Sequence, residues 1–349
     1  MKKVIAIIGC GRIANAAHLP PLSKMEDVKI KYVCDLIEEK AQKAKEEFGA
    51  EFAITDYKTA LADPEVMAVF VLTPNYAHYT ITMDALRAGK HVMCEKPITV
   101  NYALSKEMAD EAQKQGKILN IGVCNRFHES VCRIAKMNAE GKLGNVYHVY
   151  CSFRAHRSIP GLGGSFTNKQ ESGGGVLIDW GVHYLDLILY ILGGASLKSV
   201  TANTYSEMAK DMSAYKYKGM WAEDTKNLDG VNDVEDFVTG FVRTDKASIS
   251  FNGAWAQNIG KGDTYIDFLG DKGGVRLDYC GHYSFWDGEL SEDRPDYEIP
   301  NMYALEDADF LNSCITGQKN RSHIDNILES AKLLDAIYRS AAEKKELIF

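Results

Sequence analysis

The sequence predicts an α/β N-terminal domain built on a parallel sheet, followed by an α+β domain with a large open, mostly antiparallel sheet. Short apolar segments alternate with helical patterns over the first third of the 349-residue chain, as in a sheet with helices on both faces. The first apolar segment runs into a G-x-G-x-x-A turn at residues 9–14. Beyond residue 123 the segments follow one another as consecutive strands, which favours hairpin pairing. We therefore expect one domain over 1–123 and a second over 124–349, with the C-terminal helix able to pack back on the first.

The elements of the first domain follow from their apolar periodicity and from the turn residues between them. Strands are expected at 3–8, 28–34, 51–54, 66–72, 90–93 and 118–122. Helices are expected at 12–24, 38–48, 57–62, 76–88 and 101–115. Ligands of such sheets bind outside the carboxyl ends of the strands. Asp35, Thr73 and Glu95 each follow a strand end, so we expect them to gather at that edge.

The second domain begins with a helix near 127–140 and an alternating strand at 145–154. A Gly-rich loop at 155–175 precedes a strongly apolar helix at 176–192, and a polar excursion or lid is expected over 208–233. Five further strands are expected at 196–207, 234–243, 246–257, 263–270 and 274–279, and closing helices at 303–316 and 323–343. An antiparallel sheet can keep one open face. We expect this face to bury itself in a homo-oligomer, as a dimer, a tetramer or a larger assembly.

Composition excludes several classes of protein. The formal net charge of −8 argues against nucleic acid or an anionic membrane as a partner, and no apolar run approaches the length of a membrane span. The eight cysteines include no C-x-x-C pair, so we interpret them as reduced thiols of a cytoplasmic protein, with no disulfide frame and no metal site.

The Gly-rich turn indicates a dinucleotide site. Gly9 allows the tight turn after the buried strand, and Gly11 lets main chain approach a pyrophosphate because it has no Cβ. Ala14 is small enough for the next helix to pack on the sheet. Arg12 and Ile13 open that helix, whose N-terminus presents N–H groups and a positive dipole end to phosphates.

Asp35 closes the second strand about twenty residues later and is placed to accept hydrogen bonds from the adenosine ribose. It would repel a 2′-phosphate, and the next residues, Leu36 and Ile37, supply no arginine. The sequence therefore favours NAD over NADP. Capping of the following helix is a second role that the same carboxylate can fill.

Two further turns at the sheet edge carry polar groups. One of these turns lies where a strand ends and a helix begins, and it contains Thr73, Asn75 and His78. We expect these three side chains to face the cofactor. For His78, contact with the nicotinamide ribose or substrate and a place on the helix surface are equally compatible with the sequence. In the turn C-E-K-P, Lys96 follows Glu95 and a buried strand, and Pro97 stiffens the turn. A solvated loop lysine is the alternative.

Asp179 and His183 follow Gly173-Gly174-Gly175 and are spaced to share one face of an apolar helix. An acid and an imidazole there are costly unless they are paired or used, and such a pair can hold a proton-accepting histidine in place. A buried structural pair is the alternative. Metal binding is not expected, because the sequence offers no convincing further ligands.

Together these motifs resemble the Gfo/Idh/MocA family of oxidoreductases, which includes glucose–fructose oxidoreductase and inositol dehydrogenase. The resemblance covers nearly the whole chain. It rests on the 9–14 turn, on Thr73-Pro74-Asn75 with His78, on residues 88–97 ending in Glu95-Lys96-Pro97, and on the glycines before Asp179 and His183. It implies a Rossmann domain, an α/β domain with a large open sheet, a nicotinamide cofactor, and oxidation or reduction of a sugar, cyclitol or related polyol.

The resemblance also implies roles for individual residues. Lys96 would sit beside the nicotinamide, and Asp179 and His183 would line the substrate pocket. Our hypothesis is that His183 removes the proton of a secondary hydroxyl while Lys96 donates a hydrogen bond to the developing alkoxide. Asp179 would orient His183 or bind a neighbouring hydroxyl.

Other residues are candidates for contacts with cofactor or sugar. Asn125 and Arg126 follow the last strand of the first domain, where family members often place such residues; an interdomain salt bridge is the alternative for Arg126. Arg157 and Asn168 flank the Gly-rich loop and offer donors to sugar hydroxyls, and Trp180 could stack on a sugar face or belong to the core.

Three functions stay open on the sequence. The first is an NAD-dependent dehydrogenase of a sugar, cyclitol or glycoside, acting for example at C3 of a glucosyl ring. The second is a glycosidase of the same fold that uses NAD transiently, by oxidation and elimination. The third is a non-catalytic regulator that senses NAD or sugar, against which the joint presence of Lys96, Asp179 and His183 counts.

Overall fold

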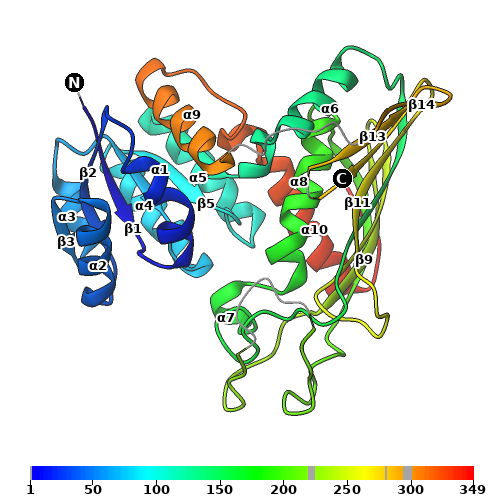
Figure 1. The fold of residues 1–349 in the computed structure, drawn as a ribbon, viewed down its shortest axis with the longest axis horizontal. Helices are drawn as coiled ribbons and strands as arrows, with labels where there is room; N and C mark the ends of the chain where they lie inside the picture. Colours follow the sequence, from blue (N-terminus) through cyan, green and yellow to red (C-terminus); the bar gives the residue numbers. More distant parts are fainter. Residues whose placement is uncertain (1, 219–224, 280, 294–300) are drawn as a thin grey trace. The chain divides into compact units, whose positions relative to one another are not determined.

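The chain folds into two compact units (Figure 1). The computed structural model describes residues 2–218, 225–279, 281–293 and 301–349. Unit 1 comprises Met1–Phe127 and Pro300–Leu328, and unit 2 comprises His128–Ile299 and Glu329–Phe349. The sequence predicted one boundary after residue 123, whereas the chain in the structure returns to unit 1 for about thirty residues late in its course.

Unit 1 is built on a six-stranded sheet in the order β3-β2-β1-β4-β5-β6, with every neighbouring pair parallel. Its strands are β1 (Lys3–Ile8), β2 (Val28–Cys34), β3 (Phe52–Ile54), β4 (Ala68–Val71), β5 (His91–Glu95) and β6 (Leu119–Gly122). This is the doubly wound order in which ligands bind at the switch between the first and fourth strands. The predicted fold class of this domain is confirmed.

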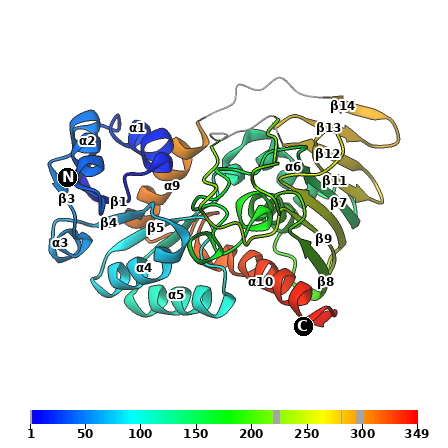
Figure 2. The same ribbon diagram turned by 90° about the horizontal axis from the view of Figure 1, so that it is seen from below.

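Helices cover both faces of this sheet, and Figure 2 shows α1 and α9 on one side with α4 and α5 on the other. They are η1 (Ala14–His18), α1 (Leu19–Leu22), α2 (Glu38–Phe48), α3 (Tyr57–Ala62), η2 (Asn75–Ala77), α4 (His78–Arg87), α5 (Tyr102–Gln115), η3 (Cys124–Phe127), α9 (Met302–Thr316) and η5 (Ile324–Asn326). The late helix α9 is part of the core of unit 1, because the rings of Phe310 and Phe70 meet edge to face at 5.3 Å and both are fully buried.

Unit 2 contains a nine-stranded sheet in the order β14-β13-β12-β11-β7-β10-β9-β8-β15. Its strands are β7 (Val146–Arg154), β8 (Leu197–Tyr205), β9 (Phe237–Thr244), β10 (Ser248–Ala254), β11 (Asp263–Gly270), β12 (Gly274–Asp278), β13 (Tyr283–Trp286), β14 (Leu290–Asp293) and β15 (Leu347–Ile348). All pairs are antiparallel except β7 with β10. The predicted large, mostly antiparallel sheet is confirmed, while the three short strands β13, β14 and β15 were not predicted.

The helices of unit 2 are α6 (Glu129–Ala139), α7 (Lys169–Ser172), η4 (Leu177–Gly181), α8 (Val182–Ile191) and α10 (Leu328–Glu343). Figure 1 places α6, α8 and α10 on one side of the sheet and, within the described residues, no helix on the other. Tyr150 and Arg243 are exposed on that open side. Assembly of copies through this face stays a prediction.

The stretch from Lys169 to Ile191, which contains α7, η4 and α8, could cross a membrane by length and composition alone. This differs from the expectation that no apolar segment reaches that length. However, 78% of its most apolar window is buried inside the structure, and a core helix of a globular domain has the same character.

The Gly-rich loop 155–175 and the excursion 208–233 are tied to each other by main-chain hydrogen bonds. Lys218 donates to the carbonyl of Arg157 at 3.0 Å, and Asn227 donates to that of Leu162 at 2.8 Å. Residues 219–224 of the excursion lie outside the described part of the chain. Its interpretation as a lid stays a prediction.

Candidate active site

The predicted site residues fall into two sets, one on each unit. In unit 1 the turn after β1 has the geometry expected of a phosphate-binding turn. Gly9 has φ +97°, and a Cβ there would lie 2.4 Å from the carbonyl oxygen of Leu72, so only glycine fits. A Cβ on Gly11 would meet nothing within 4 Å, which means that the main chain here borders open space where a pyrophosphate fits.

Asp35 lies directly after β2 and reaches across to this turn. Its Oδ2 accepts from the main-chain N–H of Cys10 at 2.9 Å, and its Oδ1 accepts from that of Ile37 at 3.0 Å. The carboxylate therefore ties the turn after β1 to the segment after β2. The predicted helix cap is not formed by Asp35, because the N-cap residue of α2 is Ile37, and the contact of Asp35 with a ribose stays a prediction.

Thr73 supplies a second observation that fits a ligand at this edge. Its Oγ1 is buried and has no hydrogen-bond partner among the residues that the structure describes, and a buried hydroxyl left unpaired is costly. Asn75 begins η2 two residues later and is partly exposed. An open glycine turn, a carboxylate on β2 and an unpaired hydroxyl after β4 fit a dinucleotide across the switch point of the sheet.

His78 differs from both interpretations weighed from the sequence. Its ring is fully buried, with Nδ1 2.8 Å from the carbonyl oxygen of Pro97 and Nε2 2.9 Å from that of Thr73. Burial opposes the charged ring, but Cys94 and these two carbonyls outweigh it and raise the pKa of His78 to about 9. Both ring nitrogens are engaged with main chain, so His78 braces the two turns and leaves no nitrogen for a ribose.

The side chain of Glu95 also points into the protein, whereas the sequence predicted a contact with the cofactor. It ends β5 and is buried, and its Oε2 accepts from the main-chain N–H of Lys96 at 3.0 Å. Its Oε1 lies 3.1 Å from Nε2 of His18. Glu95 thus holds the main chain of Lys96 from beneath, and the peptide bond between Lys96 and Pro97 is cis.

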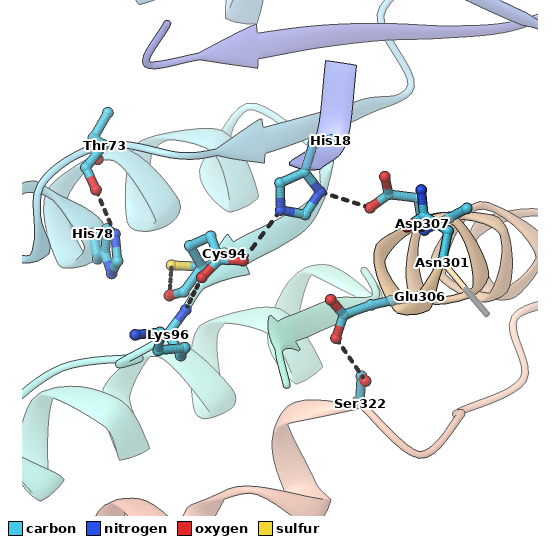
Figure 3. A network of polar contacts seen from close by, with 11 residues as sticks. His18, Thr73, His78, Cys94, Lys96, Asn301, Glu306, Asp307 and Ser322 are labelled. Atoms are coloured by element: carbon cyan, nitrogen blue, oxygen red, sulfur yellow. Dashed lines mark hydrogen bonds and ion pairs between the residues drawn. The ribbon is translucent and has the colours of Figure 1, made fainter. Parts of the chain in front are cut away.

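Figure 3 shows this network continuing into α9. Nδ1 of His18 lies 2.8 Å from Oδ1 of Asp307, and the neighbouring Glu306 accepts from Ser322 at 3.3 Å. His18, Glu306 and Asp307 are fully buried. Burial opposes the imidazolium, but Asp307 and Glu95 on either side raise the pKa of His18 well above its usual value.

In unit 2 the predicted pair occupies one face of a buried helix. From Gly174 to Leu189 every residue is buried except Asp179, Trp180 and His183, which are partly exposed. Asp179 and Trp180 lie in the π-helical turn η4 and His183 in the first turn of α8. Wide turns of this kind are frequent at functional sites. The structure therefore groups the acid, the indole and the imidazole on a single polar face.

The glycines before this helix allow close contacts that fix where it begins. A Cβ on Gly174 would lie 2.0 Å from the hydroxyl of Tyr338, and one on Gly175 would lie 1.9 Å from the carbonyl oxygen of Glu235. Glu235 accepts from the N–H of Gly175 at 2.9 Å, from that of Leu177 at 3.1 Å and from the Tyr338 hydroxyl at 2.8 Å. A buried carboxylate thus caps the helix that carries Asp179 and His183, although burial raises the pKa of Glu235.

Asp179 is fixed in turn by Trp255, whose indole Nε1 donates to its Oδ2 at 3.1 Å. Trp255 is almost fully buried, so it acts as a rigid support for the carboxylate. Asp186, three residues after His183, is buried and accepts from Ser330 of α10 at 2.7 Å.

The remaining candidates have structural contacts within their own units. Arg126 is buried in η3 and donates to the carbonyls of Arg321 at 2.7 Å and Asn326 at 3.1 Å, both in unit 1. Contact of Arg126 with a substrate stays a prediction. Asn125 beside it is partly exposed.

In unit 2, Arg157 donates to the carbonyl of its neighbour His156 at 2.9 Å. Asn168 caps α7 by accepting from Gln170 at 3.0 Å and donates to Glu171 at 2.9 Å. Contacts of these two side chains with a substrate stay predictions. Among the described residues, no group of three or more His, Cys, Asp and Glu is arranged to hold a metal ion.

The sequence reasoning missed the supporting residues His18, Asp307 and Glu235. His18 and Glu235 are titratable residues in apolar stretches, Ala16-Ala17-His18-Leu19 and Val234-Glu235-Asp236-Phe237-Val238, whereas Asp307 has acidic neighbours and gives no such signal. That pattern signals a buried polar group that needs a partner, but it does not name the partner.

Models of known protein families match sequence in both units. Residues 3–123 match the model of an oxidoreductase family with an NAD-binding Rossmann fold, and residues 131–276 match the GFO/IDH/MocA C-terminal domain. The chain is 33% identical over 288 residues to the D-glucoside 3-dehydrogenase of Escherichia coli (strain K12), covering 82% of this chain and 80% of that protein. It is 29% identical over 189 residues to the myo-inositol 2-dehydrogenase of Thermotoga maritima, covering 54% of each.

Solved structures share the fold over the full length. Levoglucosan dehydrogenase in complex with NADH and levoglucosan superposes with a TM-score of 0.83 at 20% identity, covering 100% of this chain and 99% of that one. Aldose-aldose oxidoreductase from Caulobacter crescentus gives a TM-score of 0.83 at 24% identity, covering 100% of both chains.

Proposed function

Because this chain belongs to the Gfo/Idh/MocA family of NAD-binding oxidoreductases, we propose that it oxidises a secondary hydroxyl of a sugar, glycoside or cyclitol. Within that class we favour C3 of a glucosyl ring, since the relative with 33% identity over most of both chains is a D-glucoside 3-dehydrogenase. The observation that carries the proposal is the polar face of Asp179, Trp180 and His183 on an otherwise buried helix.

The proposal assigns the binding of the dinucleotide to residues of unit 1. NAD, when bound, supplies the nicotinamide carbon that accepts the hydride. In unit 1 the turn at Gly9 and Gly11, Asp35 and Thr73 would hold the dinucleotide. Asp35 lies at the end of β2 with no arginine in the next two positions, which suits an unphosphorylated ribose.

The proton transfer is assigned to three side chains. His183 accepts the proton of the reacting hydroxyl as general base. Lys96 donates a hydrogen bond to the alkoxide that develops, so that charge is stabilised where it appears. Asp179, held by the Trp255 indole, orients His183 or accepts from a neighbouring sugar hydroxyl, and Trp180 offers an apolar surface to the ring.

The first test is turnover of the full chain with NAD and a panel of methyl glucosides, free aldoses and inositols, followed by the absorbance of reduced nicotinamide. We expect methyl glucosides to be oxidised, and borodeuteride reduction of the product to place deuterium at C3. Lys96→Ala should lower kcat by several orders of magnitude while NAD still binds, because its contribution belongs to the transition state. Lys114→Ala, on the exposed face of α5, is the matched control and should be unchanged.

Other outcomes would contradict this assignment. Release of an aglycone without net reduction of NAD would instead indicate a glycosidase that uses the cofactor transiently. Binding of NAD and sugar without any turnover would indicate a regulator. Near-normal turnover of Lys96→Ala would remove Lys96 from the mechanism.

A further inference from the structure

Beneath Lys96, unit 1 buries an unusual number of carboxyl groups around one histidine. Glu95, Glu306 and Asp307 are at most 5% exposed, and His18 is the imidazole among them. They come from three segments far apart in sequence, namely η1, the end of β5, and α9 (Figure 3). A buried charge is tolerated only when it is paired and hydrogen-bonded, so the arrangement needs an explanation.

The contacts form a chain that ends at the main chain of Lys96. Asp307 pairs with one nitrogen of His18 at 2.8 Å, and Glu95 pairs with the other at 3.1 Å. The second oxygen of Glu95 accepts from the N–H of Lys96 at 3.0 Å. A Cβ at Gly122 on β6 would lie 2.6 Å from Glu95 Oε1, so the neighbouring strand leaves room for the carboxylate in this position.

From this chain of contacts we propose that His18 and Asp307 are positioning residues for Lys96, acting through Glu95. Each ring nitrogen of His18 contacts one carboxyl group, that of Asp307 or that of Glu95, and a ring that donates from both nitrogens is an imidazolium. Glu95 is held by His18 on one oxygen and accepts from the main-chain N–H of Lys96 on the other, so it fixes the main chain of the lysine. The inference rests on the role proposed for Lys96 above, and it extends the catalytic machinery to a helix about 200 residues further along the chain.

The other titratable groups around Glu95 are neutral members of the cluster. Burial raises the pKa of Glu306 well above its usual value, with Glu95 adding to the effect. Its Oε2 has no partner among the described residues. A protonated carboxyl group tolerates such an unpaired oxygen more readily than a carboxylate does. Tyr303 and Cys124 contact one another beside Glu95, and burial raises the pKa of both.

Three isosteric or near-isosteric variants test the inference in the full-length enzyme. His18→Gln and Asp307→Asn should lower kcat about 10- to 100-fold and leave the Kd for NAD within about threefold, because a misplaced catalytic group costs rate rather than cofactor binding. Because both variants change the charge beside the turn that carries Lys96, the pH profile of kcat should shift in both. Glu306→Gln, the matched control for a neutral carboxyl, should behave as wild type.

A second readout is independent of turnover. Ring-nitrogen NMR of histidine-labelled protein should show that His18 is still an imidazolium at pH 7, and Asp307→Asn should lower the pH at which it titrates. A neutral His18 at pH 7 would overturn the inference. So would wild-type kcat and an unshifted pH profile in both His18→Gln and Asp307→Asn while Lys96→Ala is inactive. An active Lys96→Ala would instead show that the proposed function itself has failed.

Discussion

Both ring nitrogens of His78 lie within hydrogen-bond distance of main-chain carbonyl oxygens, and this decides the charge of the ring. A carbonyl oxygen can only accept, so the ring must donate from both nitrogens, as only the imidazolium does. The charged form therefore joins the turn after β4 to the turn that carries Lys96 and Pro97.

This pairing predicts a pH dependence of stability. The pKa of His78 in the folded state is about 9, above the ordinary 6.5. Its contribution is therefore fully present below pH 6.5 and is lost as the pH rises through 9. At about 1.4 kcal/mol per pKa unit, the loss is roughly 3 kcal/mol. Urea denaturation at pH 6.5 and 9.5 measures it as the difference between wild type and His78→Gln.

His91→Gln is the control for this measurement. Burial, with a smaller effect of Lys117, lowers the pKa of His91 to about 4, so His91 stays neutral over the range studied. We expect this variant to keep the wild-type pH dependence. If His78→Gln kept it as well, His78 would not be charged in the folded protein.

At the scale of elements, N–H groups at the start of the helix formed by η4 and α8 donate to a side chain and not to solvent. The first N–H groups of a helix have no partner within it, and Glu235 accepts from two of those near this start. Because Asp179 and His183 lie within the first two turns, the cap sets the position of the proposed catalytic face.

Glu235→Gln should therefore affect both stability and rate. The amide has only one acceptor oxygen, so a buried N–H loses its partner, which costs about 1–3 kcal/mol. We expect kcat to fall because the polar face is no longer held in place. Asn101→Ala removes the cap of α5 in unit 1, costs about 1 kcal/mol, and should leave kcat unchanged. Equal kcat in the two variants would show that the Glu235 cap serves stability alone.

For the whole molecule, the sequence was most informative where local pattern decides structure. Strand–helix alternation and the turn at Gly9 predicted unit 1 and its cofactor, and the spacing of Asp179 and His183 predicted their shared face. The inward turn of Glu95 and His78 could not be predicted, because it depends on partners that only the folded chain brings together. The same holds for α9, since its apolar residues do not say which unit they pack against.

The contribution of α9 to unit 1 can be measured directly. Phe310 is fully buried against Phe70, and replacing a buried phenylalanine by alanine costs about 3–5 kcal/mol. Phe310→Ala should lower the free energy of unfolding by this amount in urea denaturation. Leu305 on the same helix is 44% exposed, and Leu305→Ala should change it by less than about 1 kcal/mol. A small effect of Phe310→Ala would mean that α9 is dispensable for the core of unit 1.

The late return of residues 300–328 to unit 1 also has a consequence for synthesis on the ribosome. Domains usually fold in the order in which they emerge, but here the first 127 residues emerge without the helix that completes their core. The strands of unit 2 from β7 to β14 leave the ribosome before that helix does. The nascent chain must therefore hold an unfinished dinucleotide-binding unit, in which Phe70 and His18 lack their partners on α9, until almost the whole protein has been made.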